Sequence, residues 1–138
     1  MNYTQIEDYH LLIQPQQITQ LVGISGGTQI DLANEMALAE VKSYLVQKYD
    51  MPLEYSQTGT SRSLQVVMAV VDISLYILHS RIAPTNIPEL RQKRYEQTIA
   101  WLKNCAKGMV TPALTPIDIT TTGSKFRFGS YPQQPNNY

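Results

Sequence analysis

Few side chains in this chain could carry a covalent or acid–base reaction. It has one cysteine, Cys105, and two histidines, His10 and His79. A nucleophilic thiol needs a base and a group that orients the base, and His79 and Asp72 could supply these roles. However, the apolar pattern around Cys105 favours a small buried hydrophobe on a helix. We therefore expect no catalytic residue and no enzyme, and keep a hydrolase using Cys105 as a third alternative.

The sequence predicts neither a metal site nor a cofactor site. Two histidines and one cysteine far apart lack the ligand spacing of a zinc site. The glycine-rich segment 23–28 is not followed by Gly-Lys-Ser/Thr, so it is not a phosphate-binding loop. Glu7 and Asp8 are better explained as the negative first turn of a helix. A single cysteine also excludes an internal disulfide and fits a reducing compartment.

Asp72 is the unusual residue of an otherwise apolar stretch, 64–78. A charged carboxylate there must find a partner or lie at an edge. Arg91 and Arg94, or a tyrosine hydroxyl, could provide that partner. We predict a structural ion pair, and the alternative is an active-site acid.

The charges are unevenly distributed along a chain whose net charge is zero. Residues 1–60 carry seven acidic and two basic residues, and residues 61–138 carry four acidic and nine basic residues. The two halves could neutralise each other within one subunit, or join subunits head to tail. Charged residues make up only 16% of the chain, against about 25% in typical domains. So few charged residues predict that part of the surface is covered by copies of the same chain, and hence that the protein is a homo-oligomer.

A small basic cluster, Arg91, Lys93 and Arg94, could contact nucleic acid. Glu89 and Glu96 lie beside it and the chain is neutral overall, so a solvated or subunit-facing helix surface explains it better. A nucleic-acid-binding or regulatory helical protein is therefore the second functional hypothesis. A non-specific DNA contact within a larger assembly fits either interpretation.

Five helical segments are predicted around one core, at 4–13, 15–22, 31–49, 64–78 and 88–107. Segment 64–78 has almost no polar face, so we expect it to be central. Tyr44, Leu45 and Tyr49 lie on one stripe of the preceding helix, and Pro52 is expected to end it before a loop at 50–62. No stretch reaches the ~20 apolar residues of a membrane span, and the first residues do not form a signal peptide.

The C-terminal segment has a different pattern. Two short β-prone runs flank Gly123-Ser124, which predicts a type II′ hairpin. The hairpin and the arm after it could pair with a neighbouring subunit or fold back on the same chain. We thus expect an all-α domain of four to five helices at 1–114, and a hairpin or extended arm at 115–138. The candidate subunit-interface residues are Phe126, Arg127, Phe128 and Tyr131.

Three segments in order resemble a family of small helical proteins of tailed phages, the Mu-like prophage head–tail connector or head-completion group. They are SYLVQKYDMPL at 43–53, DISLYILHSR at 72–81, and the pattern R..RY...I.WL...A.G at 91–108. The resemblance extends over about residues 3–114. The residues that match motif positions are Tyr44, Tyr49, Pro52, Asp72, Arg81, Arg94 and Tyr95.

The resemblance implies a structural role. Such proteins form rings beneath the portal of the capsid, bridge the portal to the tail, and help to retain packaged DNA. It implies portal and tail proteins as partners, and a location in the virion after assembly in the host cytoplasm. It transfers no binding site and no catalytic residue.

Overall fold

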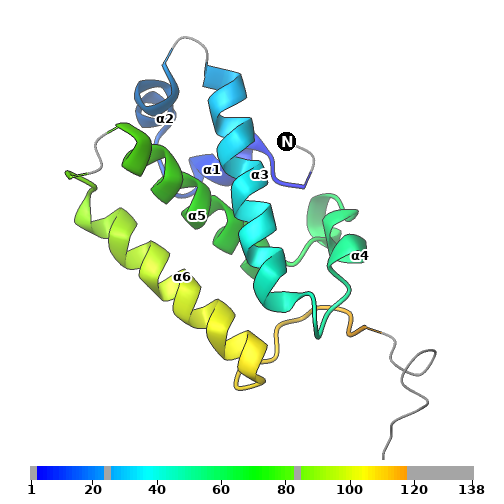
Figure 1. Cartoon of the computed structure of the whole chain (residues 1–138). Coiled ribbons are helices and arrows are strands. Elements are labelled where there is room, and N and C mark those ends of the chain that lie inside the picture. Colours follow the sequence, from blue (N-terminus) through cyan, green and yellow to red (C-terminus); the bar gives the residue numbers. More distant parts are fainter. Residues whose placement is uncertain (1–2, 24–25, 83–84, 118–138) are drawn as a thin grey trace, which may run out of the picture.

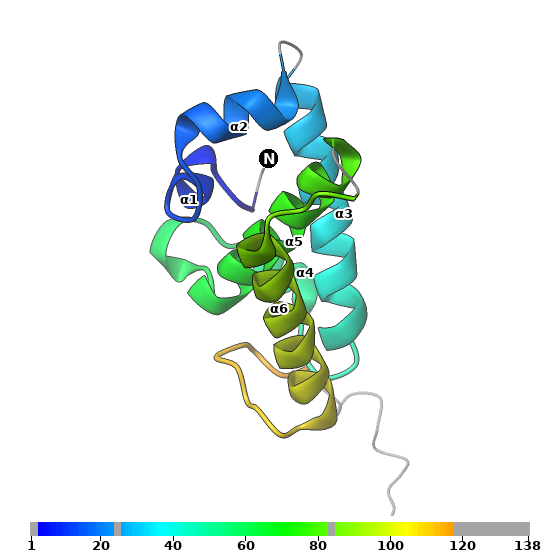
Figure 2. The same ribbon diagram turned by 90° about the vertical axis from the view of Figure 1, so that its left-hand side faces the viewer.

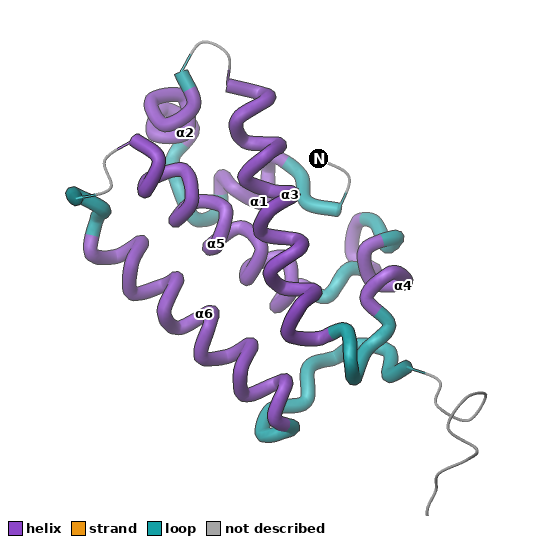
Figure 3. Tube along the Cα trace, viewed as in Figure 1, coloured by secondary structure: helices purple, strands orange, loops and turns teal. Residues whose placement is uncertain are grey.

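The computed structural model describes residues 3–23, 26–82 and 85–117. This part of the chain contains helices and loops but no strand (Figures 1 and 3), which confirms the predicted all-α class there. The described residues contain six α-helices instead of the predicted four to five, because one short helix lies in the predicted loop at 50–62. The elements are α1 (Ile6–His10), α2 (Pro15–Val22), α3 (Gly26–Leu45), α4 (Met51–Tyr55), the 3-10 turn η1 (Gly59–Ser61), α5 (Leu64–Ile82) and α6 (Glu89–Lys107).

Helix α5 forms the centre of the bundle, as its apolar sequence predicted. Helices α1, α2, α3 and α6 all pack against it, and Figure 1 shows α5 between α3 and α6. Val66, Val70, Ile73 and Leu75 are fully buried. In length and composition α5 could cross a membrane, yet 56% of it is buried inside the protein. The core helix of a bundle has this burial, so we assign α5 to the core.

Helix α3 begins at Gly26, five residues before the predicted start at Asp31, and ends at Leu45. Its buried stripe is Ala33, Ala37, Val41 and Leu45, which recur every four residues. Helical periodicity predicts that Met36 also lies on this stripe, but 58% of it is exposed. The small side chains of the stripe let α5 approach closely, and Met36, one residue from Ala37, is turned away from that contact.

The predicted loop at 50–62 contains α4 and η1, and the expected role of Pro52 was wrong. Asp50 caps α4, since the N–H of Leu53 donates to its Oδ1 at 3.0 Å. Pro52 lies in the first turn, where its missing N–H costs no hydrogen bond. Pro52 therefore starts a helix, and α3 has already ended before Tyr49.

Helix α4 positions Glu54, which joins the N-terminal segment to the start of α5. Glu54 is 8% exposed. The hydroxyl of Tyr3 and the N–H of Ser63, the latter at 2.7 Å, both donate to Glu54 Oε2. Arg62 donates to the carbonyl of Tyr3 at 2.8 Å and pairs with Asp8 at 2.7 Å. One carboxylate thus satisfies a buried tyrosine and an N–H at the positive end of the α5 dipole.

Replacing Glu54 with alanine should destabilise the protein by about 2–3 kcal/mol, because the Tyr3 hydroxyl and the Ser63 N–H lose their acceptor in a buried site. Urea denaturation measures the change. Glu96→Ala on the exposed face of α6 is the control and should change stability by no more than about 0.5 kcal/mol. Equal effects of the two substitutions would contradict this role of Glu54.

Helix α6 begins at Glu89 and ends at Gly108, close to the predicted bounds. Gly108 adopts φ +82°, the left-handed conformation typical of a helix C-terminus. Helical periodicity predicts that Leu90 and Leu102 both face inward; Leu102 is buried, whereas Leu90 is 61% exposed. Leu90 lies in the first turn of α6, at the rim of a hollow beside the end of α5.

After α6 the chain returns to the corner between α3 and α4. The N–H of Asp50 donates to the carbonyl of Thr115 at 2.8 Å, and that of Ile117 donates to the carbonyl of Lys48 at 3.1 Å. Tyr49 and Pro116 form an isolated antiparallel bridge. The predicted hairpin and the interface residues Phe126, Arg127, Phe128 and Tyr131 lie outside the described residues.

Candidate functional site

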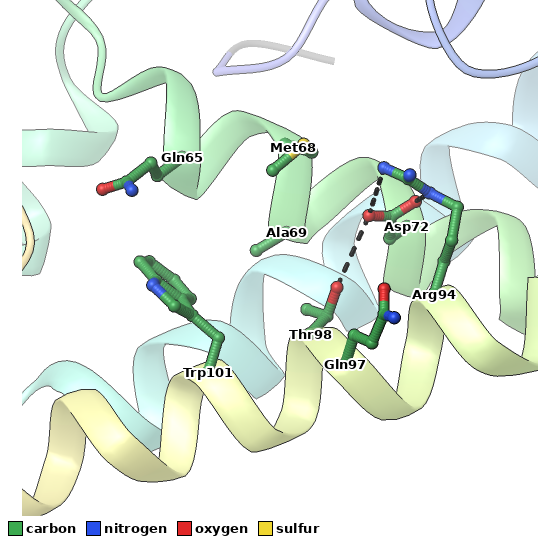
Figure 4. Close-up of a pocket in the computed structure, with 8 residues that line it drawn as sticks. All are labelled: Gln65, Met68, Ala69, Asp72, Arg94, Gln97, Thr98 and Trp101. Carbon is green, nitrogen blue, oxygen red and sulfur yellow. Dashed lines mark hydrogen bonds and ion pairs between the residues drawn. The ribbon is translucent and has the colours of Figure 1, made fainter. Parts of the chain in front are cut away.

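The most unusual polar group of the described core is Asp72, which is 4% exposed. Arg94 binds it through two hydrogen bonds, Nε to Oδ1 at 2.7 Å and Nη2 to Oδ2 at 3.0 Å. The hydroxyl of Thr98 lies 3.4 Å from Oδ2. Figure 4 shows this arrangement, with Asp72 reaching from α5 towards two residues of α6 one turn apart. The predicted ion pair between Asp72 and an arginine of α6 is confirmed.

Arg91 is a second cation near the same carboxylate. Its Nη1 is 3.9 Å from Asp72 Oδ1, and its Nη2 donates to the carbonyl of Leu12 at 2.9 Å. Only 8% of its side chain is exposed, and burial lowers its pKa, whereas the charge of Asp72 raises it. Two arginines therefore share one carboxylate, and Arg91 links α6 to the turn after α1.

A hollow of about 230 Å³ opens beside this cluster, between α5 and α6. Met68 and Trp101 line it, Ala69 leaves room between them, and Asp72 and Arg94 lie at one end (Figure 4). Both oxygens of the Asp72 carboxylate already accept hydrogen bonds from Arg94 and Thr98, so the group is not available as a general base. The hollow is suited to an apolar side chain with a polar tip rather than to acid–base chemistry.

A second hollow, of about 450 Å³, lies where α1 and α2 meet the end of α5 and the start of α6. Its rim includes Ile82 and Leu90, which are 48% and 61% exposed. His79 also lines it, with Nδ1 2.8 Å from the carbonyl oxygen of Leu75. Since a carbonyl can only accept, Nδ1 carries the proton. The lining of this hollow is therefore mixed, with apolar side chains beside Gln17, Gln20, His79 and Arg91, and its rim is partly open.

The residues considered for a nucleophilic site have other partners. Cys105 is fully buried, and burial raises the pKa of its thiol, the opposite of what a nucleophile needs. Asp72 is held by Arg94, and His79 by Leu75. These contacts favour the prediction that Cys105 is a small buried hydrophobe.

The predicted basic cluster is largely neutralised by protein contacts. Arg91 and Arg94 bind within the bundle, and Lys93 pairs with Glu89 at 2.9 Å on the exposed side of α6. The structure therefore does not offer these three side chains together as a cationic surface for phosphate groups.

The remaining motif residues stabilise the fold at separate places. The ring of Tyr95 stacks on Tyr76 with centroids 4.0 Å apart, and its hydroxyl lies 3.4 Å from Glu40. Tyr44 is half-buried against the core and Tyr49 is 8% exposed. Arg81 is exposed near the end of α5. Within the motif set, the structure brings Asp72 and Arg94 into direct contact.

Sequence reasoning missed Glu54, which connects three separate segments. The signal was present in Asp50 followed by Pro52, a cap residue and a first-turn proline. No group of three or more His, Cys, Asp or Glu side chains suited to a metal ion occurs within residues 3–23, 26–82 and 85–117.

The sequence model of the family described as "Bacteriophage Mu, Gp36" matches residues 3–127, most of the chain. No curated protein matches the sequence.

Proposed function

Because the chain belongs to the bacteriophage Mu Gp36 family, we propose that it is a structural subunit of a phage head–tail connector. In this role it forms a ring of identical subunits between the portal and the tail, acts without catalysis, and is present in the virion. The family match over residues 3–127 carries the proposal.

The structure supports a role in assembly through its exposed apolar side chains. Ile82 and Leu90 beside the larger hollow, and Met68 beside the smaller one, are 47–61% exposed. Exposed apolar groups gathered around hollows are typical of interaction surfaces. A ring needs two different complementary surfaces on each subunit, and in this proposal the side chains around the two hollows belong to one of them. The neutralised cluster on α6 gives no support to the alternative of direct nucleic-acid recognition.

Deletion of the gene from the phage or prophage that encodes it tests this function. We expect heads and tails to be made in normal amounts and to remain separate in electron micrographs of the lysate. Supplying the wild-type gene in trans should restore joined particles. A regulatory protein would instead change the amounts of heads and tails. That result, or normal virions without the gene, would overturn the proposal.

A further inference from the structure

Helix α3 has a second apolar stripe, on the side that faces solvent. Leu32, Ala39 and Val46 recur every seven residues, so they lie almost in line along the helix. Leu32 is 56% exposed, Val46 is 40% exposed and Ala39 is exposed. Met36 borders the stripe and is 58% exposed. Val46 continues the helical turn, since its N–H donates to the carbonyl of Lys42 at 2.9 Å.

This outer stripe lies opposite the buried one. At 100° per residue, Ala39 is about 180° from the core residue Ile30, and Ala37 and Val41 lie on the same inner side as Ile30. Figure 2 shows α3 along one edge of the bundle, with α5 on its inner side. A single helix thus carries two apolar faces, and only the inner one has a partner within the described residues.

The pattern of the outer face is symmetric about Ala39. In an antiparallel pair centred on Ala39, Leu32 faces Val46 of the partner subunit. Glu35 and Lys42, which are both exposed, lie on the same flank of the stripe. Glu35 then lies beside Lys42 of the partner subunit, and the contact repeats by symmetry. Opposite charges meet twice across such an axis, and a small residue at its centre allows close approach of the helices.

We propose that the outer face of α3, formed by Leu32, Glu35, Met36, Ala39, Lys42 and Val46, binds a second copy of this chain in an antiparallel, two-fold symmetric contact. We infer that the partner is a second copy because the outer face is complementary to itself. Its apolar residues and its opposite charges both match those of an antiparallel copy. A two-fold contact closes after two copies and cannot extend into a ring. It is therefore distinct from the ring contact and does not depend on the connector role.

Sedimentation of the full chain tests this contact. The 15.6 kDa chain should sediment as a dimer near ~100 µM and dissociate on dilution towards ~1 µM, as expected for a modest apolar interface. Ala39→Glu should leave a monomer whose melting temperature equals that of wild type at ~1 µM, where wild type is also expected to be a monomer, because Ala39 is exposed. Ala100→Glu, at an exposed alanine of α6, is the matched control and should dimerise as wild type does.

Charge reversal and crosslinking test the symmetry. Glu35→Lys or Lys42→Glu alone should weaken the dimer by about fivefold or more, and the double reversal within one chain should restore it. Ala39→Cys should form a disulfide-linked dimer on mild oxidation, whereas Ala100→Cys should not; the native Cys105 is buried and gives little background. A monomer at every concentration, a dimer that survives Ala39→Glu, or no crosslink through position 39 would overturn the proposal.

Discussion

Replacing Asp72 with alanine should destabilise the protein by about 3–5 kcal/mol, because Arg94 and Arg91 then lose the carboxylate that balances their charges in a mostly buried site. Asp72 is 4% exposed and Arg91 is 7% exposed, so water cannot fully replace the lost partner. Thermal or urea denaturation followed by circular dichroism measures the loss.

A double-mutant cycle separates this pairing from general damage to the core. Arg94→Ala alone should also destabilise, and the Asp72→Ala/Arg94→Ala double variant should lose less than the two single losses combined. Glu89→Ala, which breaks the exposed pair with Lys93, is the control and should cost no more than about 0.5 kcal/mol. Additive losses at positions 72 and 94 would contradict the coupling.

Alkaline pH should unfold the protein through its buried tyrosines. Burial raises the pKa of Tyr9 from 10.0 to about 12, and burial also raises the pKa values of Tyr3 and Tyr55. A tyrosine whose folded pKa is raised stabilises the protein fully below its unfolded pKa, and this stability is lost as pH rises through the folded value. Between about pH 10 and 12, each such tyrosine should remove up to about 1.4 kcal/mol of stability per pH unit.

Urea denaturation at a series of pH values from about 8 to about 12 measures this loss. Tyr9→Phe cannot ionise at position 9, so its stability should fall less steeply above about pH 10 than that of wild type. The variant also loses the hydrogen bond of 3.1 Å from Tyr9 to Asn34, which lowers stability at every pH and does not change the slope. Identical slopes, or no loss of stability in this range, would contradict the prediction.

The sequence predicts the centre of this fold better than its outer faces. Segment 64–78 is apolar on nearly every side, so its central position and the need of Asp72 for a cation both follow from composition. Helix α3 is different, because apolar residues occur on two opposite faces. Periodicity alone cannot decide which of Met36 and Ala37 is buried. Close packing of α5 against the alanines decides it, and that is a property of the tertiary structure.

Segment 50–62 contains two local signals that predict different structures. Its serine, threonine and glycine content favours a loop, and this outweighed the shorter signal of Asp50 and Pro52 that starts α4. The role of Glu54 depends on Tyr3 and Ser63. No spacing rule relates Tyr3 to Glu54, so only the folded arrangement reveals their contact.

The bridge between Tyr49 and Pro116 has a mechanical consequence. Two backbone hydrogen bonds, from Asp50 to Thr115 and from Ile117 to Lys48, attach the end of the described chain to the corner between α3 and α4. A force applied to the chain beyond residue 117 reaches these two bonds before it reaches α6. The two hydrogen bonds of the bridge therefore break first under tension, and they can re-form when the tension ends. The core around α5 stays folded meanwhile.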